Sequence, residues 1–339
     1  MAMRWQCRGG PMYAYQFSSI GPATQANSSG RSNGIDTWCA QYLSGAGTLN
    51  VSAPFITPFA AGSAILVGHA MQDSAVTGTN TDTLFTLKEG ATLHLTIAVN
   101  SSNAIVVTRG DGTVLGTSAA NACVLDASDW QYVTAKVVIS DTVGSILVQV
   151  YGTVVLNLSG IDTRNGGTGV VDTIGHGFNR LMQDLFIADD TGAIFNALPS
   201  NFQVLDLPLN ADTAQADFAL QPTGTPAYAK LTNQDDDSSY LYSATVGAKS
   251  EFGCTDTPAS PTTGFVAVAW GQRARRDDTA SRGSQAYIKS GSTVLNGTAL
   301  VTTQSYNNQM DTTETDPATG AAWTKAGIDA LLWGVKVSS

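Results

Sequence analysis

Charged residues are scarce in this chain of 339 residues. Asp, Glu, Lys and Arg make up 13% of it, about half the usual share of a globular protein. The 17 basic and 27 acidic residues give a net charge of −10, and one arginine cluster, Arg273 to Arg276, is followed at once by Asp277 and Asp278. We therefore expect no surface for nucleic acid or for an anionic membrane, and we interpret the arginine cluster as a solvated turn.

Long hydrophobic runs are missing as well. No stretch of about 18 apolar residues occurs, so no transmembrane helix is expected. The amino terminus, Met1 to Arg8, is not followed by an apolar stretch of the length of a secretory signal. The four cysteines, Cys7, Cys39, Cys123 and Cys254, have the spacing of neither a zinc ribbon nor a redox pair. Without secretion, reduced and partly buried thiols are expected.

The sequence offers few residues for catalysis. A glycosidase of the concanavalin-A-like fold needs two carboxylates about 5 to 9.5 Å apart, which calls for alternating acidic residues on one strand. The three glutamates, Glu89, Glu251 and Glu314, each lie near an expected turn instead. We therefore expect no enzyme activity.

The three histidines are separated along the chain, and no serine nucleophile motif surrounds any of them. His94 falls on the polar face of its strand and is expected to be exposed or to lie between strands. His176 is expected in a turn, and His69 in a core strand.

Short segments rich in β-branched and aromatic residues, separated by Gly, Asp, Asn and Ser, fill most of the chain. They predict strands joined by tight turns. Leu93, Leu95, Ile97 and Val99 alternate with polar or small residues, and 133–139 and 146–151 predict a hairpin across Asp141 to Gly144. The fold class expected is all-β, a concanavalin-A or laminin-G-like jelly-roll sandwich plus a second, smaller antiparallel β-sandwich.

Three regions are expected along the chain. Residues 1–60 are irregular and rich in aromatics, and they form either the first jelly-roll strands or a docking segment for another subunit. Residues 61–200 form the jelly roll. Residues 201–339 form the C-terminal β-sandwich, with a junction near 200 to 215. Near its end, Thr324 caps a short helix over 325–332, followed by a strand over 333–337.

Several segments are similar to a family of virion proteins of tailed bacteriophages and prophages. The resemblance covers the chain from about residue 62. Its segments are Arg109–Ser118, Asn157–Thr163, Leu209–Asp217, Asp235–Tyr240, Ala274–Asp278 and Glu314–Thr324. The last of these segments is the most specific. It implies a laminin-G-like domain followed by a β-rich carboxyl domain in a virion or tail protein. Residues 6–45 depart from the family, so the attachment surface is expected to differ.

The leading hypothesis is a non-enzymatic structural protein of a tailed-phage virion, assembled in the bacterial cytoplasm. It would be an exterior tail, tail-fibre or appendage component that contacts host-surface glycans. The alternatives are a capsid decoration or head-fibre protein and, less favoured, a carbohydrate-active enzyme. The expected partners are tail, connector or capsid subunits and further copies of the chain, with a trimer favoured. No cofactor is expected.

Ligand contacts are expected from loops at the edge of the sandwich, because amides, hydroxyls and glycines suit sugar hydroxyls. The candidate residues are Asp141, Asn165, Thr168, Asn179 and Arg180. The glycine-rich segment over 165–169 is interpreted as a flexible loop, since it lacks the helix and lysine of a phosphate site. Trp130 is expected in the core and not as a stacking platform.

Metal binding is left open by the sequence. Two groups of aspartates could supply oxygen ligands for calcium, the run over 235–237 and the set Asp184, Asp189 and Asp190 near a strand end. Neither group has the spacing of a known calcium loop, so solvent-exposed carboxylates are the favoured interpretation.

Overall fold

A computed structural model of the chain gives its fold for residues 3–7, 23–27, 38–42, 49–72, 82–125, 129–178, 181–192, 196–201, 203–205, 207–224, 226–232, 237–259 and 264–339. Side chains are described from residue 58 onward, except those of residues 176–178, 181–183, 232 and 308 within these ranges. No helix in these ranges is long and apolar enough to span a membrane.

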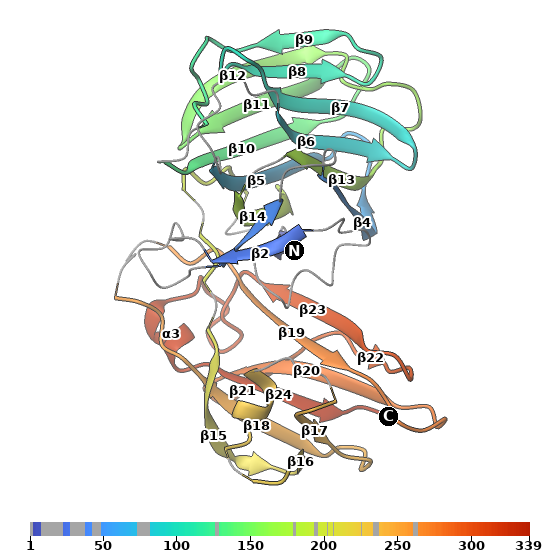
Figure 1. Cartoon of the computed structure of the whole chain (residues 1–339), viewed down its shortest axis with the longest axis vertical. Helices are drawn as coiled ribbons and strands as arrows, with labels where there is room; N and C mark the ends of the chain where they lie inside the picture. The colour runs from blue at the N-terminus through green and yellow to red at the C-terminus, as the bar shows by residue number, and fades with distance from the viewer. Residues whose placement is uncertain are drawn as a thin grey trace. The chain divides into compact units, whose positions relative to one another are not determined.

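The chain divides into two compact units. The jelly-roll unit comprises 2–192 and 196–204, and the C-terminal unit comprises chiefly 205–339. Both units are built almost entirely of antiparallel strands (Figure 1). The expected fold class, a jelly-roll sandwich with a second, smaller β-sandwich and a short helix near the C-terminus, is confirmed.

The jelly-roll unit packs two sheets face to face. Sheet A has the order β12-β11-β10-β5-β14-β3-β2, with β1 also paired to β14, and sheet B has the order β4-β13-β6-β7-β8-β9. The strands of sheet A are β12 (Thr153–Ile161), β11 (Gly144–Val150), β10 (Gln131–Val138), β5 (Ala64–Gln72), β14 (Leu181–Asp189), β3 (Trp38–Tyr42), β2 (Ala23–Asn27) and β1 (Met3–Cys7). Those of sheet B are β4 (Leu49–Phe59), β13 (Val171–Phe178), β6 (Asp82–Glu89), β7 (Thr92–Val99), β8 (Ile105–Arg109) and β9 (Val114–Thr117). The backbone before residue 60 thus supplies β1 to β3 to sheet A and β4 to sheet B.

The core between the two sheets follows from the period-two pattern of the strands. In β7, Leu95, Ile97 and Val99 are buried in it, whereas Thr96 and Ala98 between them are half-buried on the other face. The same alternation places Val133, Ala135 and Val137 of β10 in the core. Each fully buried aliphatic side chain of this kind contributes about 1.5–3 kcal/mol, so the alternation fixes which face of each strand turns inward.

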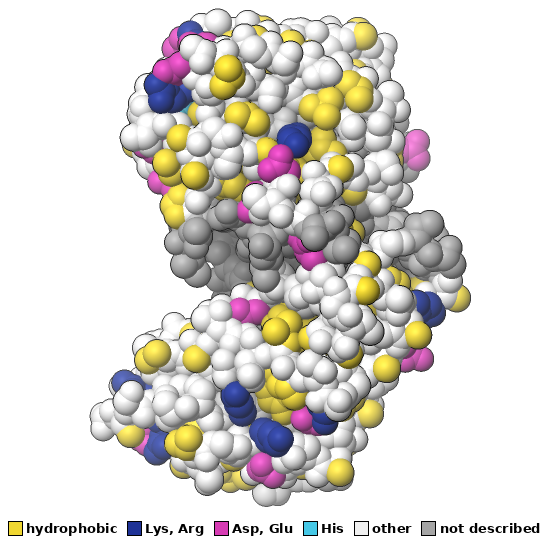
Figure 2. Space-filling model, turned by 180° about the vertical axis from the view of Figure 1, so that it is seen from behind, with side chains coloured by type: hydrophobic (Ala, Val, Ile, Leu, Met, Phe, Trp, Pro, Cys, Tyr) yellow, Lys and Arg dark blue, Asp and Glu magenta, His cyan; other side chains and the backbone are white. Residues whose placement is uncertain are grey.

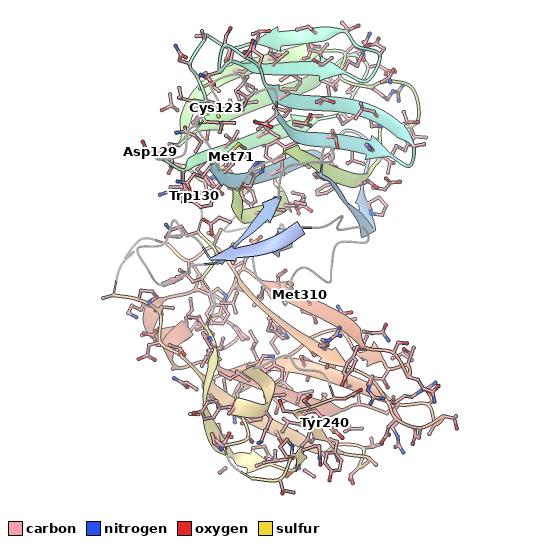
Figure 3. The ribbon with its side chains drawn as sticks, in the orientation of Figure 1. Met71, Cys123, Asp129, Trp130, Tyr240 and Met310 are labelled. Carbon is pink, nitrogen blue, oxygen red and sulfur yellow. The ribbon has the colours of Figure 1, made fainter. Side chains whose placement is uncertain are left out.

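Trp130 is not part of this core, contrary to the sequence-based expectation. It precedes β10 and is partly buried next to the exposed Asp129 (Figure 3). Its carbonyl accepts a hydrogen bond from the hydroxyl of Tyr151, which lies in the turn between β11 and β12. A tryptophan that leads a strand therefore lies at the end of the sandwich here, not between its sheets.

The two cysteines whose side chains are described are free thiols, Cys123 buried and Cys254 partly buried. Burial raises the pKa of Cys123 to about 12 and that of Cys254 to about 11. Both are therefore unreactive thiols at neutral pH. Cys7 and Cys39 lie outside the described side chains.

The C-terminal unit is built on one sheet of order β15-β18-β24-β20-β21, with β22 paired to β20, and two strand pairs, β16-β17 and β19-β23. Its elements are β15 (Leu209–Ala216), β16 (Ala219–Gln221), α2 (Ala229–Thr232), β17 (Tyr240–Tyr242), β18 (Lys249–Cys254), β19 (Val268–Ala274), β20 (Gly283–Ser290), β21 (Thr293–Asn296), β22 (Leu300–Val301), β23 (Asn307–Thr313), α3 (Lys325–Asp329) and β24 (Leu332–Val337). The hydroxyl of Thr324 caps α3 by accepting the Gly327 N–H at 3.1 Å. The helix is shorter than the expected 325–332 because β24 begins at Leu332.

A glycine in the middle strand of this sheet makes room for a buried polar contact. Gly334 of β24 pairs with Glu251 of β18 on one side and with Tyr287 of β20 on the other. The tyrosine ring crosses over Gly334, and its hydroxyl donates to Glu251 Oε1 at 3.1 Å. Lys289 Nζ binds the other carboxylate oxygen at 3.0 Å. Burial, together with the charge of Glu251, raises the pKa of Tyr287.

We expect Gly334→Ala to lower the free energy of unfolding by about 1–3 kcal/mol, the usual cost of overpacking. A Cβ at Gly334 would lie 2.5 Å from Tyr287 Cε2, so the ring would have to move away from Glu251. Urea unfolding followed by tryptophan fluorescence measures the loss. Gly253→Ala in the neighbouring strand, where the nearest atom is 3.3 Å away, is the control and should cost less. Equal losses in the two variants would contradict this explanation.

Candidate functional site

The connection between β12 and β13, residues 162–170, carries the chain from sheet A to sheet B at one end of the sandwich. We call it the rim loop. Its first part is tied to sheet A, because the Thr163 N–H donates to Ser140 O at 2.9 Å and the Thr163 hydroxyl accepts the Ser140 N–H at 2.9 Å. Ser140 follows β10, so the rim loop and the β10–β11 turn form one continuous surface.

The second part of the rim loop is tied to sheet B through Glu89, the last residue of β6. The Glu89 carboxylate accepts the Thr168 N–H at 2.8 Å, the Thr168 hydroxyl at 2.7 Å and the Gly169 N–H at 3.1 Å. The hydrogen bond from the Thr168 hydroxyl is the largest cause that lowers the pKa of Glu89. The loop is therefore fixed by a carboxylate, not free as its glycine content suggested.

His94 of β7 is the second anchor of the rim loop on sheet B. Its Nδ1 accepts the Asn165 N–H at 3.3 Å, and its Nε2 lies 3.4 Å from Glu89 Oε2. His94 alternates with the core residues of β7 and so points away from the core, as expected, but it is fully buried. The rim loop covers it, which corrects the expectation of an exposed side chain.

Three glycines allow these close contacts. A Cβ at Gly110 would overlap Leu93 O and lie 2.5 Å from Asn165 Nδ2, which itself donates to Leu93 O at 3.0 Å. A Cβ at Gly144 would overlap the Thr163 hydroxyl, and one at Gly167 would overlap the Glu89 carboxylate. Gly167 also has a φ of +63°, which other residues adopt at a cost. These glycines are therefore required by packing around the loop.

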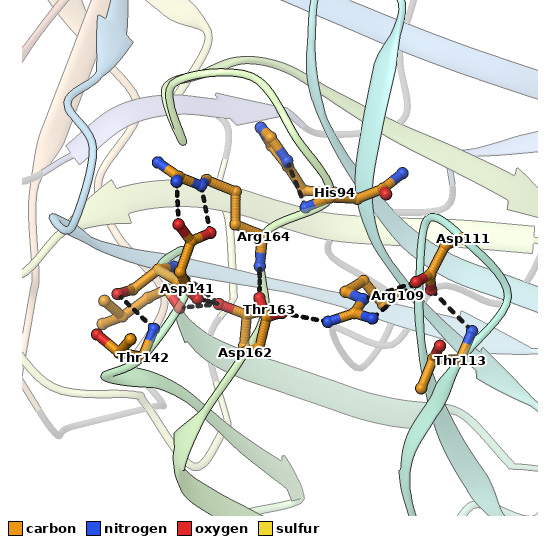
Figure 4. Close-up of polar contacts among 12 residues, drawn as sticks. His94, Arg109, Asp111, Thr113, Asp141, Thr142, Asp162, Thr163 and Arg164 are labelled. Carbon is orange, nitrogen blue, oxygen red and sulfur yellow. Dashed lines mark hydrogen bonds and ion pairs between the residues drawn. The ribbon is translucent and has the colours of Figure 1, made fainter.

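Two arginines link the charged side chains of this end of the sandwich (Figure 4). Arg164 of the rim loop donates to both carboxylate oxygens of Asp141 and, at 3.3 Å, to Thr168 O. Arg109, the last residue of β8, pairs with Asp162 and, at 2.7 Å, with Asp111. The hydrogen bond from Arg109 holds the pKa of Asp111 far below its usual range.

These residues concentrate charge in a chain that has little of it. We call Glu89, Arg109, Asp111, Asp141, Asp162 and Arg164 the polar rim. Figure 2 shows a dense gathering of acidic and basic side chains at one edge of the jelly-roll unit. Exposed ion pairs contribute little to stability. Stability alone is thus a weak reason for them; in the structure they join the rim loop to the β10–β11 turn and to the end of β8.

The structure brings together three of the five predicted ligand residues. Asp141 of the β10–β11 turn is bound by Arg164, and on the rim loop Thr168 is bound by Glu89 and Asn165 by His94. Asn179 and Arg180 lie outside the described residues. The sequence-based reasoning missed Arg109, Arg164, Glu89 and His94 as parts of this end of the sandwich. The sequence contained one partial signal for Arg109. The segment Arg109-Gly110-Asp111-Gly112 places a charged pair in a glycine turn directly after a strand.

The aspartates considered for calcium are engaged in other contacts. Asp237 pairs with Arg275 at 2.6 Å, Asp190 with Lys136 at 2.9 Å, and Asp184 accepts the Val204 N–H at 2.9 Å. Asp235 and Asp236 lie outside the described residues. Within the ranges that the structure describes, no three His, Cys, Asp or Glu side chains gather as metal ligands.

No family model and no curated protein sequence matches the chain. Its fold is similar to those of several solved structures. An endo-β-1,4-glucuronan lyase from the fungus Trichoderma reesei is 10% identical with a TM-score of 0.40, covering 55% of this chain and 95% of that one. The alginate lyase Aly36B is 13% identical with a TM-score of 0.36, covering 55% and 94%. The globular domain of T. cruzi calreticulin is 11% identical with a TM-score of 0.39, covering 55% and 88%.

The sequence-based prediction that the chain is not an enzyme is corrected by this comparison. The solved structures with similar folds include two proteins named as glycan lyases. The prediction rested on the missing pair of carboxylates, which is a requirement of glycoside hydrolysis and does not test other ways of cleaving a glycan. One fold also hosts many activities. At these identities the likeness shows the fold alone and assigns no activity to this chain.

We expect strong acid to loosen the second part of the rim loop through Glu89. Because the folded pKa of Glu89 is lowered, the stability that its own ionisation contributes to the loop is complete above the ordinary glutamate pKa of 4.5 and is lost as the pH falls through the lowered value. Hydrogen exchange of the Thr168 and Gly169 amides, corrected for intrinsic rates, measures this loss. Glu89→Gln should weaken their protection at neutral pH and remove this acid step. An acid step that survives in Glu89→Gln would show that another group causes it.

Proposed function

We propose that this chain is an exterior component of a tailed-phage virion, in a tail or appendage, and that its jelly-roll unit contacts glycans of the host surface through the polar rim. The observation that carries the glycan part is the joining of two loops by Arg164. It holds Asp141 from the β10–β11 turn against the rim loop that carries Asn165 and Thr168.

Several properties of the polar rim suit a glycan. Side chains that are fixed before binding lose little conformational entropy when a ligand arrives. Asp141 and Asp162 keep exposed carboxylates, with side-chain exposures of 50% and 44%, and each can accept further hydrogen bonds from sugar hydroxyls. Gly112 and Gly166, where a Cβ would meet nothing within 4 Å, let a ligand approach the backbone closely.

The composition supports the exterior virion role. The chain carries few charges and is rich in Gly, Ser and Thr, so its strands stay soluble through hydroxyls and amides. A single rim of this size would bind a glycan weakly. Several copies on one particle would gain affinity through effective concentration, which is why we include further copies of the chain among its partners.

Binding of the full chain to a glycan array tests the glycan part of the proposal. We expect binding to a subset of glycans, weakened about tenfold by Asp141→Asn, because a hydrogen bond to a charged group is worth about 1.5–3 kcal/mol. Asp278→Asn is the matched control. It removes a carboxylate of similar exposure, 42%, from an ion pair with Arg282 in the C-terminal unit. Equal binding by the two variants would show that the glycan contact lies outside the polar rim. No binding by the unmodified chain would refute the glycan role.

Labelling of intact particles tests the virion part. Antibodies against this chain should mark the tail or an appendage in electron micrographs of the phage that encodes it. Marking of the head would favour the capsid decoration alternative. If the purified particles do not contain the chain, the virion role is wrong.

A further inference from the structure

His94 anchors the rim loop, and its position could also make the hold on the loop depend on the protonation of its ring. We propose that His94 is a proton-operated latch, which holds the rim loop closed when its imidazole is neutral and releases it when the imidazole is protonated. As regulation of the polar rim, this inference rests on the proposed function. The movement of the loop itself can be measured without any ligand.

The first argument is the direction of the hydrogen bond at His94 Nδ1. This nitrogen accepts the Asn165 N–H at 3.3 Å. A ring nitrogen that accepts a hydrogen bond carries no proton, so the closed loop requires a neutral ring with its proton on Nε2. Protonation would add an N–H at Nδ1 to the one at Nε2. The Nδ1 N–H would then face the Asn165 N–H, and the contact between these two donors would become repulsive.

The second argument is the position of Nε2. It is buried, lies 3.4 Å from Glu89 Oε2 and has no hydrogen bond of good geometry. The Glu89 oxygens are used by Thr168 and Gly169 of the rim loop. A buried imidazolium needs a counter-charge, and Glu89 is the carboxylate beside it. Protonation would therefore draw Glu89 toward the ring and away from the loop.

The other charged groups around His94 do not reverse this sign. Arg109 at the end of β8 is balanced by Asp111 and Asp162, and Arg164 on the rim loop is balanced by Asp141. Asp172 of β13 accepts the Gly90 N–H in the β6–β7 turn. Lys88 of β6 precedes Glu89 in the chain. Glu89 Oε2 lies 3.4 Å from Nε2 while it accepts the Thr168 and Gly169 N–H groups, and in the proposed latch it turns from these groups toward the protonated ring.

Imidazoles change charge between about pH 5 and 8, in contrast to carboxylates. A loop closed at neutral pH and open in mild acid would alter any contact made through Asn165 and Thr168. Arg164 would still join the loop to Asp141 of the β10–β11 turn, and its contact with Thr168 O at 3.3 Å is the one that the movement would change.

Hydrogen exchange of the full chain between pH 7.5 and 5.5, corrected for intrinsic rates, tests the latch. The Asn165, Thr168 and Gly169 amides should lose at least about tenfold of their protection in mild acid. The Thr163 amide, bound to Ser140 O at 2.9 Å, should keep its protection. His94→Asn, whose amide oxygen can accept the Asn165 N–H without titrating, should remove the step, and His176→Gln should retain it. Protection that does not change between the two pH values in the unmodified chain would overturn the latch, and so would a step that persists in His94→Asn.

The glycan array at the same two pH values separates the latch from the proposed function. Loop release in mild acid together with no glycan binding at either pH would refute the glycan role and leave the latch standing. Glycan binding that depends on Asp141, with a loop that stays protected at both pH values, would refute the latch and leave the glycan role standing.

Discussion

The rim of the jelly roll depends on the need to satisfy the backbone of a loop that crosses from one sheet to the other. Residues 162–170 leave sheet A and enter sheet B without a strand partner for their N–H groups. The hydrogen bonds of the Asn165 and Gly169 N–H groups are partly buried, and a buried N–H group without a partner costs about 1–3 kcal/mol. The Glu89 carboxylate and His94 Nδ1 supply acceptors at the end of sheet B, so these two side chains fix the part of the loop that carries Asn165 and Thr168.

The strands could be predicted from the sequence because their signal is local. The alternation of Leu93 to Val99, the turns at Gly90 and over 141–144, and the cap at Thr324 each depend on residues within a few positions of one another. The sandwich class follows from many such strands. The end of α3 was placed too late, because the pairing of β24 with β18 and β20 takes Leu332 into the sheet.

The candidate site was only partly predictable, because its contacts span long distances in sequence. Loops at one end of a sandwich were expected to converge, and this reasoning selected Asp141, Asn165 and Thr168. Their anchors come from elsewhere: Glu89 and Thr168 are separated by 79 residues, and Arg164 and Asp141 by 23. The burial of His94 has the same origin, since the residues that cover it follow it by about 70 positions. Neither periodicity nor composition records such pairings.

The chain has only three glutamates, and in the structure two of them make specific contacts beside a glycine. A surface rich in hydroxyls and amides has few carboxylates, and two of the three glutamates serve individual contacts. Glu89 binds the rim loop beside Gly167, and Glu251 binds Tyr287 across Gly334. In both cases a glycine leaves the space through which a partner reaches a carboxylate. Each glutamate then requires the glycine beside it, because a side chain at either glycine would displace the partner and leave the carboxylate without its hydrogen bond.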